Sequence, residues 1–173
     1  MPHGRRDPII GYTIVESSLG TVLVGATKGG VAAVLFGAAE DLLAGLSREH
    51  PGAELVRDDG ALADIAAAVI AAINGVPSPT LPLDLGGTEF QRAVWKALGE
   101  IPVGTTATYS EVAAAIGRPK SVRAVANACG DNRIAVLVPC HRVVRTDGGL
   151  GGYKWGLDRK RALLEAEGAP LPR

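Results

Sequence analysis

Cysteine is scarce in this chain, with two cysteines among 173 residues, Cys129 and Cys140. Two cysteines cannot form the disulfide framework of a small secreted protein, so they favour a reducing compartment. Long apolar runs are also lacking, because no stretch approaches the roughly 18 to 20 apolar residues that a membrane-spanning helix needs. The basic start from Met1 to Pro8 leads into no apolar segment of the kind that signal peptides contain. These absences predict a soluble cytoplasmic protein.

A net charge is lacking as well, since 18 lysines and arginines match 18 aspartates and glutamates. By itself this balance argues against a nucleic-acid binder. The two halves differ, however. Residues 1–86 contain five basic and ten acidic side chains, a net charge of −5, whereas residues 87–173 contain thirteen and eight, a net charge of +5. This asymmetry predicts a basic working face on the C-terminal half, although a solvated surface without a partner would give the same count.

A hydrophobic content of 47% allows a proper core in one domain or in two small ones. Residues 74–82 contain three prolines and one glycine and lack periodicity, so this segment is predicted to be a linker. The predicted domains are therefore residues 1–80, a scaffold that includes the start of the linker, and residues 81–173.

The first domain is predicted to contain an antiparallel three-stranded meander, because runs rich in β-branched residues alternate with turn sequences. The predicted strands are residues 9–16, 21–26 and 31–36. Apolar spacing and alanine content predict helices over 38–49 and 61–73, with one more short strand at 53–56. Nothing in this half indicates chemistry, which favours a structural scaffold.

The second domain is predicted to be mainly helical. Thr88 is expected to cap a helix whose apolar face carries Phe90, Val94, Trp95 and Leu98. Ser110 is expected to cap a second helix, which Gly117 ends, and a third opens at Lys120 or Ser121 and runs to about Cys129. Two short helices joined by a glycine-containing turn predict a helix-turn-helix. The predicted fold class is thus α+β: a small antiparallel sheet with helices, then this helical domain with the cysteine segment.

The third of these helices surrounds one arginine, Arg123, with small residues. They are Ser121, Ala124, Ala126, Asn127 and Ala128. The backbone of such a helix could approach a groove of DNA closely while the arginine projects. Tight packing against a neighbouring helix would give the same composition.

Cys140 and His141 are the only close thiol and imidazole in the sequence, within the apolar run 136–144. The other histidines, His3 and His50, are predicted to lie in a terminus and a polar loop. A free thiol has a pKa of about 8.5, and an adjacent base is the usual means of activating it.

Neighbouring side chains in an extended segment point to opposite faces, so a Cys140–His141 contact needs a turn or a bridging water. Pro139 favours a local bend because it fixes its own φ. The alternative for each cysteine is an inert core residue, which is the interpretation we prefer for Cys129.

The string Pro139-Cys-His-Arg-Val-Val144 occurs together with several other short motifs in a fixed order. Upstream lie Tyr109, the segment 121–125 and Asn132, and downstream lie the segments 151–156 and 163–168. From Phe90 to Gly168 this order resembles the O6-alkylguanine-DNA alkyltransferases, also called methylated-DNA-protein-cysteine methyltransferases. The N-terminal half resembles that family only in layout.

The resemblance implies direct-reversal repair of double-stranded DNA. The O6-alkyl (methyl) group of guanine, and the O4-alkyl group of thymine, would pass irreversibly to Cys140, once per molecule, from a base flipped out through the minor groove. His141 would deprotonate the thiol through a water, and Glu167 would orient the histidine. Asn132 would tie the helix-turn-helix to the active-site segment, and Tyr109 would give a hydrogen bond or a proton to the leaving guanine.

The resemblance also assigns binding roles. Arg123 would fill the space of the flipped nucleotide, and the same helix would contact DNA through Lys120, Ser121, Ala124, Ala126 and Asn127. Tyr109, Val143, Tyr153 and Lys154 would form the base pocket, although some relatives have a serine at the position of Lys154.

No cofactor is expected, and no structural zinc, because no cysteine precedes Cys129. The protein is expected to be a monomer, with cooperation along DNA left open. Two alternatives remain: a non-catalytic binder of alkylated DNA, although such relatives replace the cysteine, and a thiol hydrolase.

Overall fold

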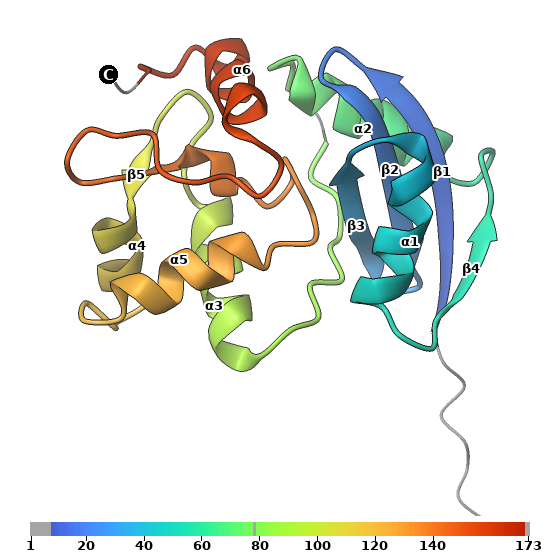
Figure 1. The fold of residues 1–173 in the computed structure, drawn as a ribbon, viewed down its shortest axis with the longest axis horizontal. Coiled ribbons are helices and arrows are strands. Elements are labelled where there is room, and N and C mark those ends of the chain that lie inside the picture. The colour runs from blue at the N-terminus through green and yellow to red at the C-terminus, as the bar shows by residue number, and fades with distance from the viewer. Residues whose placement is uncertain (1–7, 78, 172–173) are drawn as a thin grey trace, which may run out of the picture.

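The computed structural model describes residues 8–77 and 79–171, which form two lobes side by side (Figure 1). The N-terminal lobe, residues 9–73, is a sheet with helices, and the C-terminal lobe, residues 89–167, is mainly helical. The predicted α+β class is confirmed. Some predictions concern residues outside the described ranges. They are those for the chain before Pro8, which includes His3, and for Ser78 of the linker.

The sheet of the N-terminal lobe contains the predicted meander. Strands β1 (Ile9–Ser17), β2 (Gly20–Thr27) and β3 (Gly30–Phe36) pair antiparallel in sequence order. A fourth strand, β4 (Glu54–Arg57), pairs parallel with β1, so the strand order is β3-β2-β1-β4. A parallel pair needs a crossover connection, and helix α1 (Ala39–Glu49) supplies it between β3 and β4.

Helix α2 (Ala63–Ile73) packs against β1, and α1 packs against β2 and β3. The middle of β2 is buried at four successive residues, Val22 to Gly25, so both faces of the sheet are covered there. Strand residues alternate between faces, and only a sheet covered on both sides buries consecutive residues.

The open edge of β3 is where the two lobes meet. The linker follows this edge first: the Val31 amide donates to the Pro82 carbonyl (2.9 Å), and the Asp84 amide donates to the Val31 carbonyl (2.8 Å). Gly30 permits this approach, because a Cβ at that position would overlap the Pro82 carbonyl. Farther along, Val34 exchanges two hydrogen bonds of 3.0 Å with the backbone at Arg133 and Ala135. The edge of β3 therefore fixes the segment that precedes Cys140. The division into two domains at the linker stays a prediction.

Helix α3 (Glu89–Gly99) begins after Thr88, which caps it as predicted, and the Thr88 side chain forms a capping box with Gln91. Helix α4 (Tyr109–Ala115) begins at Tyr109 instead of after Ser110, so the prediction that Ser110 is the cap is wrong. Thr108 has the extended backbone of an N-cap, and its hydroxyl accepts from the Glu111 amide (3.1 Å), completing a second capping box.

The remaining elements of the C-terminal lobe surround the cysteine. Helix α5 (Val122–Gly130) follows α4 after a turn, and α6 (Leu157–Glu167) closes the chain. The short strands β5 (Ala107–Thr108) and β6 (Val143–Val144) pair parallel. Within residues 8–77 and 79–171, no helix is long and apolar enough to cross a membrane.

Candidate active site

The segment that carries Cys140 is a series of tight turns, although its composition is that of a strand. The Leu137 amide donates to the Ala135 carbonyl (2.8 Å) around Val136, whose φ is +71°. The Cys140 amide donates to the Val138 carbonyl (2.8 Å) around Pro139, and residues Cys140–Arg142 form a 3-10 turn. A β-branched residue with positive φ is strained, so the surrounding contacts must hold this conformation. The predicted bend at Pro139 is therefore present.

Asn132 is one of the contacts that hold these turns. It is 1% exposed and lies just after α5, at the start of the cysteine segment. Its side-chain oxygen accepts from the Ile134 amide (2.9 Å), and its Nδ2 donates to the Val138 carbonyl (2.9 Å) and to Cys140 Sγ (3.2 Å). Asn132, just after α5, thus holds the active-site segment by three hydrogen bonds and contacts the sulfur, and its role as a tie to a helix-turn-helix stays a prediction.

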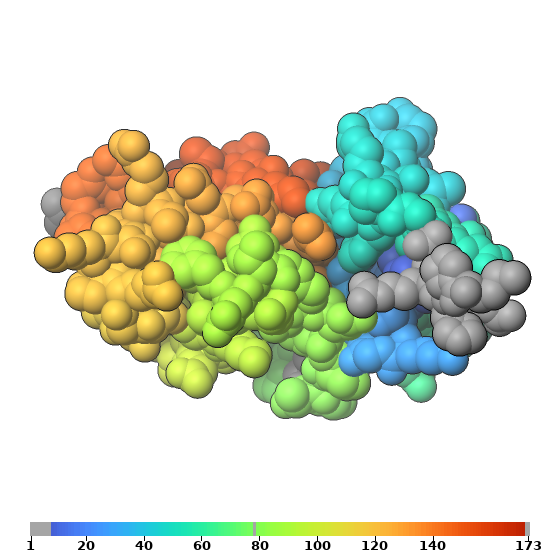
Figure 2. All heavy atoms as spheres, turned by 90° about the horizontal axis from the view of Figure 1, so that it is seen from below, coloured from blue at the N-terminus to red at the C-terminus, as the bar shows by residue number. Residues whose placement is uncertain are grey.

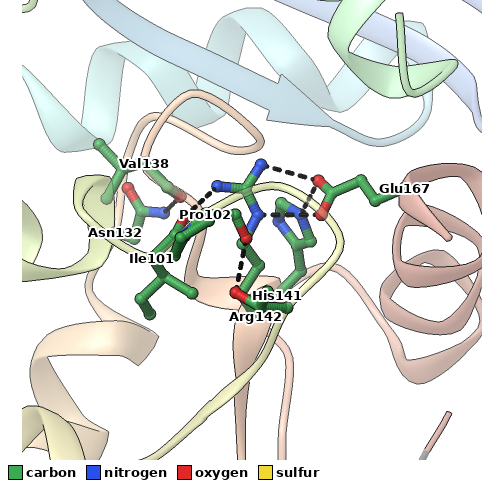
Figure 3. Close-up of polar contacts among 8 residues, drawn as sticks. Ile101, Pro102, Asn132, Val138, His141, Arg142 and Glu167 are labelled. Atoms are coloured by element: carbon green, nitrogen blue, oxygen red, sulfur yellow. Dashed lines mark hydrogen bonds and ion pairs between the residues drawn. The ribbon is translucent and has the colours of Figure 1, made fainter. Parts of the chain in front are cut away.

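Beside Cys140, His141 is fully buried and its Nε2 lies 2.6 Å from Oε1 of Glu167 (Figure 3). Arg142 holds the same carboxylate through two hydrogen bonds, of 2.9 Å and 3.0 Å. Burial alone would raise the pKa of Glu167, but the hydrogen bonds from His141 and Arg142 lower it to about 2. Glu167 is therefore ionised at neutral pH, and Nε2 donates to it.

Because Nε2 donates, Nδ1 is the ring nitrogen of His141 that can accept a proton. Among the described residues Nδ1 has no hydrogen-bonding partner. Burial lowers the pKa of His141, more than the nearby carboxylate of Glu167 raises it, so the ring is neutral at rest. A neutral imidazole with one unengaged nitrogen can act as a base.

Cys140 is 4% exposed. Burial raises its pKa, which the hydrogen bond from Asn132 and the charge of Lys160 only partly oppose. The thiol is therefore protonated at rest and needs a base to react.

A cavity of about 210 Å³ lies next to the Cys140 thiol. Its walls come from α4, α5, the cysteine turn and the loop before α6, and they are Tyr109, Ala126, Cys129, Gly130, Cys140, Gly152, Tyr153 and Lys154. The structure thus brings together three of the four predicted pocket residues with Cys140. Val143 is not part of this wall, and its buried carbonyl accepts a hydrogen bond from Lys160 instead.

Tyr109 enters this cavity because it opens α4 directly after β5, which pairs with β6 two residues beyond His141. Burial, followed by the nearby thiols of Cys129 and Cys140, raises the pKa of Tyr109 to about 12. Its hydroxyl therefore keeps its proton at neutral pH and can donate it. Gly151 has φ +77°, and a Cβ there would lie 3.0 Å from the Tyr109 hydroxyl, so a glycine is required for the loop to pass.

Helix α5 presents the predicted DNA-binding residues to solvent. Of the predicted residues, Arg123, Ala124, Ala126 and Asn127 on α5 and Lys120 before it are exposed, whereas Ser121 is half-buried. Residues of this region form the end of the molecule away from the N-terminal lobe in Figure 2. Ala126 belongs both to the exposed face and to the cavity wall, so the helix borders the cavity directly.

Three side chains of the site were missed from the sequence, those of Arg142, Cys129 and Lys160, as were Gly130 and Gly152 of the cavity wall. Lys160 is fully buried on α6, and its Nζ donates to the carbonyls of Val143 (2.6 Å) and Gly152 (3.0 Å). Burial lowers its pKa to about 8. The sequence contains a pattern that predicts the burial of Lys160. Lys160 and Glu167 lie on the same helical stripe as Leu163 and Leu164, at spacings of three, four and seven.

Comparisons with known proteins agree with this arrangement. Residues 89–169 match the family model described as "6-O-methylguanine DNA methyltransferase, DNA binding domain". The chain is 40% identical to the methylated-DNA–protein-cysteine methyltransferase of Methanosarcina barkeri, over 90% of this chain and 96% of the relative. It therefore belongs to the methylated-DNA–protein-cysteine methyltransferase family, which confirms the resemblance.

Other relatives are longer or have been solved as structures. The chain is 44% identical to the Escherichia coli bifunctional transcriptional activator/DNA repair enzyme Ada over 95% of its own length, and it spans 47% of that protein. It thus spans about half the length of the first curated relatives that it matches. The Mycobacterium tuberculosis OGT structure in complex with DNA superimposes with a TM-score of 0.78 at 39% identity, covering 92% of this chain and 95% of that one.

Proposed function

We propose that this protein repairs DNA by transferring the O6-alkyl group of guanine, a methyl group above all, to Sγ of Cys140. One observation carries the proposal: a buried thiol lies at a cavity wall, next in sequence to a histidine that a carboxylate orients. The relatives named for methylated DNA and for cysteine methyltransferase activity support the same conclusion.

In the proposed reaction, side chains of this protein and one bridging water account for every proton that moves. The proton of the Cys140 thiol passes through a bridging water to Nδ1 of His141, and Glu167 stabilises the resulting imidazolium. The thiolate attacks the alkyl carbon, so an S–C bond forms while the C–O6 bond breaks. The electron pair moves onto guanine, which takes a proton from the hydroxyl of Tyr109. Tyr109 then recovers its proton from the imidazolium.

The product explains a single turnover. Alkylated Cys140 is a thioether, which has no activated bond that water could cleave, so the alkyl group stays on the sulfur. Neither a cofactor nor a metal takes part in the proposed steps, in which His141, Tyr109 and the bridging water transfer the proton.

We propose further that the guanine is flipped out of double-stranded DNA through the minor groove, because an in-line thiolate cannot reach O6 inside a duplex. Arg123, on the exposed face of α5 that borders the cavity, would then fill the vacated space, and its small neighbours would allow close approach. O4-alkylthymine is a further substrate of this proposal. A cytoplasmic location stays a prediction.

The test is incubation with a duplex that carries one O6-methylguanine, followed by peptide mass mapping. We expect one methyl group per protein, on Cys140, and an equal amount of restored guanine. Binding without modification would contradict the proposal in favour of a lesion binder, and repeated turnover would favour a thiol hydrolase. Cys140→Ala should abolish transfer and retain binding, whereas Cys129→Ala should still accept the methyl group.

A further inference from the structure

Lys154 connects three parts of the molecule that are distant in sequence. Its Nζ donates to Oε1 of Glu49 (2.7 Å) and to the backbone carbonyl of Asn132 (3.0 Å). It also lies 5.2 Å from the ring centre of Trp155. Glu49 is the last residue of α1 in the N-terminal lobe, 105 residues before Lys154.

This ion pair differs from the other lysine or arginine pairs at the surface. The side chains of Lys154 and Glu49 are 29% and 21% exposed, whereas those of Arg145 and Asp147 are 61% and 60% exposed. Exposed local pairs contribute little, because water screens the charges and the side chains lose entropy. Shielding from solvent strengthens the contact of Lys154 with Glu49 and its hydrogen bond to Asn132.

The contacts of Lys154 lead to the reacting sulfur through one residue. Asn132 accepts from Lys154 at its backbone carbonyl and donates from its Nδ2 to Cys140 Sγ (3.2 Å). Lys154 itself belongs to the wall of the cavity, together with Tyr153 and Gly152 of the same loop. A movement of the Lys154 side chain would therefore displace both the cavity wall and the asparagine that holds the sulfur.

We propose that Glu49 and Lys154 are positioning residues for alkyl transfer: α1 of the N-terminal lobe holds the cavity loop and Asn132 in the reactive arrangement. The N-terminal lobe contributes no residue to the cavity wall, so it acts on Cys140 through contacts between the lobes, and this pair and the edge of β3 are the ones that reach Asn132 and the residues after it. This inference rests on the proposed function, but one of its two assays measures the reactivity of Cys140 whether or not that function is correct.

The experiment compares Glu49→Gln, Lys154→Met and the double variant in two assays at 20 °C. The first is transfer from free O6-benzylguanine, which requires no base flipping, and the second is alkylation of Cys140 by iodoacetamide, located by mass mapping. We expect each single variant to slow both reactions by roughly tenfold, and the double variant to be no slower than Lys154→Met, because the two side chains act as one unit. Lys154→Arg keeps the positive charge and should therefore lose less rate than Lys154→Met in both assays.

Glu40→Gln is the matched control, because it removes the same charge from the exposed first turn of the same helix. It should leave both rates unchanged even if it lowers the melting temperature. Wild-type rates in Glu49→Gln and Lys154→Met would overturn the inference, as would additive losses in the double variant. If the wild type transfers nothing from O6-benzylguanine, the proposed function fails, and the iodoacetamide rates still decide whether the pair positions Cys140.

Discussion

Replacing Glu167 with glutamine separates the proposed base from its orienting group without changing the shape of the site. The native carboxylate accepts from Nε2 of His141 at 2.6 Å and from Arg142 at 2.9 Å and 3.0 Å. Glutamine offers one carbonyl oxygen and one NH₂ group, so either His141 or Arg142 must face a donor. If the oxygen stays with the charged guanidinium, the ring nitrogen Nε2 must accept. The proton then lies on Nδ1, which can no longer take a proton from Cys140.

The rate consequence is large because the wrong tautomer cannot act as the base. An aspartate-to-asparagine change at the corresponding place of a serine triad lowers kcat by about 10⁴-fold. For Glu167→Gln we expect the single-turnover rate of methyl transfer to fall by roughly 10³- to 10⁴-fold. Rapid-quench measurement of methyl transfer from duplex DNA to Cys140 gives this rate.

The same change alters stability and its dependence on pH. A pKa lowered from 4.5 to about 2 corresponds to at most about 3 kcal/mol. Solvent reaches Glu167 and Arg142 in part, so screening reduces the expected loss in Glu167→Gln to about 2 kcal/mol at pH 7. Because the folded-state pKa is lowered, this stabilisation is present above pH 4.5 and is lost as the pH falls towards 2.

Urea unfolding from pH 7 to pH 2 measures these differences. The gap in unfolding free energy between wild type and Glu167→Gln should close between pH 4.5 and 2. Both proteins should also lose stability as the pH falls below 6.5, because His141 is held neutral when folded and takes up a proton when unfolded. Wild-type transfer rates in Glu167→Gln, or a gap that persists undiminished to pH 2, would refute this account of the relay.

Three further predictions concern the cavity and its entrance. Arg123→Ala should slow repair of a duplex by at least about tenfold more than the reaction with free O6-benzylguanine, since only the duplex requires base flipping; equal losses would refute the role of Arg123. Tyr109→Phe should slow transfer by roughly 10²-fold while retaining affinity for alkylated DNA, because it removes the proton donor and keeps the ring; an unchanged rate would exclude that donor role. Methylation of Cys140 should lower the melting temperature in calorimetry, since extra volume in a packed site costs about 1–3 kcal/mol and the Asn132 hydrogen bond to sulfur weakens; an unchanged melting temperature would mean that the site has room to spare.

The elements with strong local signals could be predicted from the sequence. The four strands of the N-terminal lobe and helices α1 to α5 follow from periodicity and turn residues, whereas α6 was not predicted. The Thr88 cap follows from one threonine before an apolar helix face. The same local rule failed at Ser110. Thr108 and Ser110 could each have capped α4. Thr108 is the cap because Glu111, three residues after it, completes the capping box.

Apart from the bend at Pro139, the conformation of the cysteine segment could not be predicted from its residues, because tertiary contacts override its β propensity. Val136 and its neighbours have the composition of a buried strand, yet Val136 adopts φ +71°. The hydrogen bonds from Asn132 and the pairing with β3 supply the constraint that the apolar run itself lacks. The resemblance identified Cys140 and His141 as a relay, and the structure adds the turn that makes such a relay geometrically possible.

Asn132 is the point at which the two lobes act together on the reactive thiol. The N-terminal lobe fixes the chain immediately after Asn132 through the backbone bonds of Val34 to residues 133 and 135. It also fixes the Asn132 carbonyl through Glu49, at the end of α1, and Lys154. The contact on the Asn132 carbonyl and the bonds to residues 133 and 135 together limit the movement of Asn132, so Nδ2 stays directed at the sulfur. The N-terminal lobe, which carries no chemistry of its own, is for this reason expected to set the reactivity of Cys140 and to be required for it.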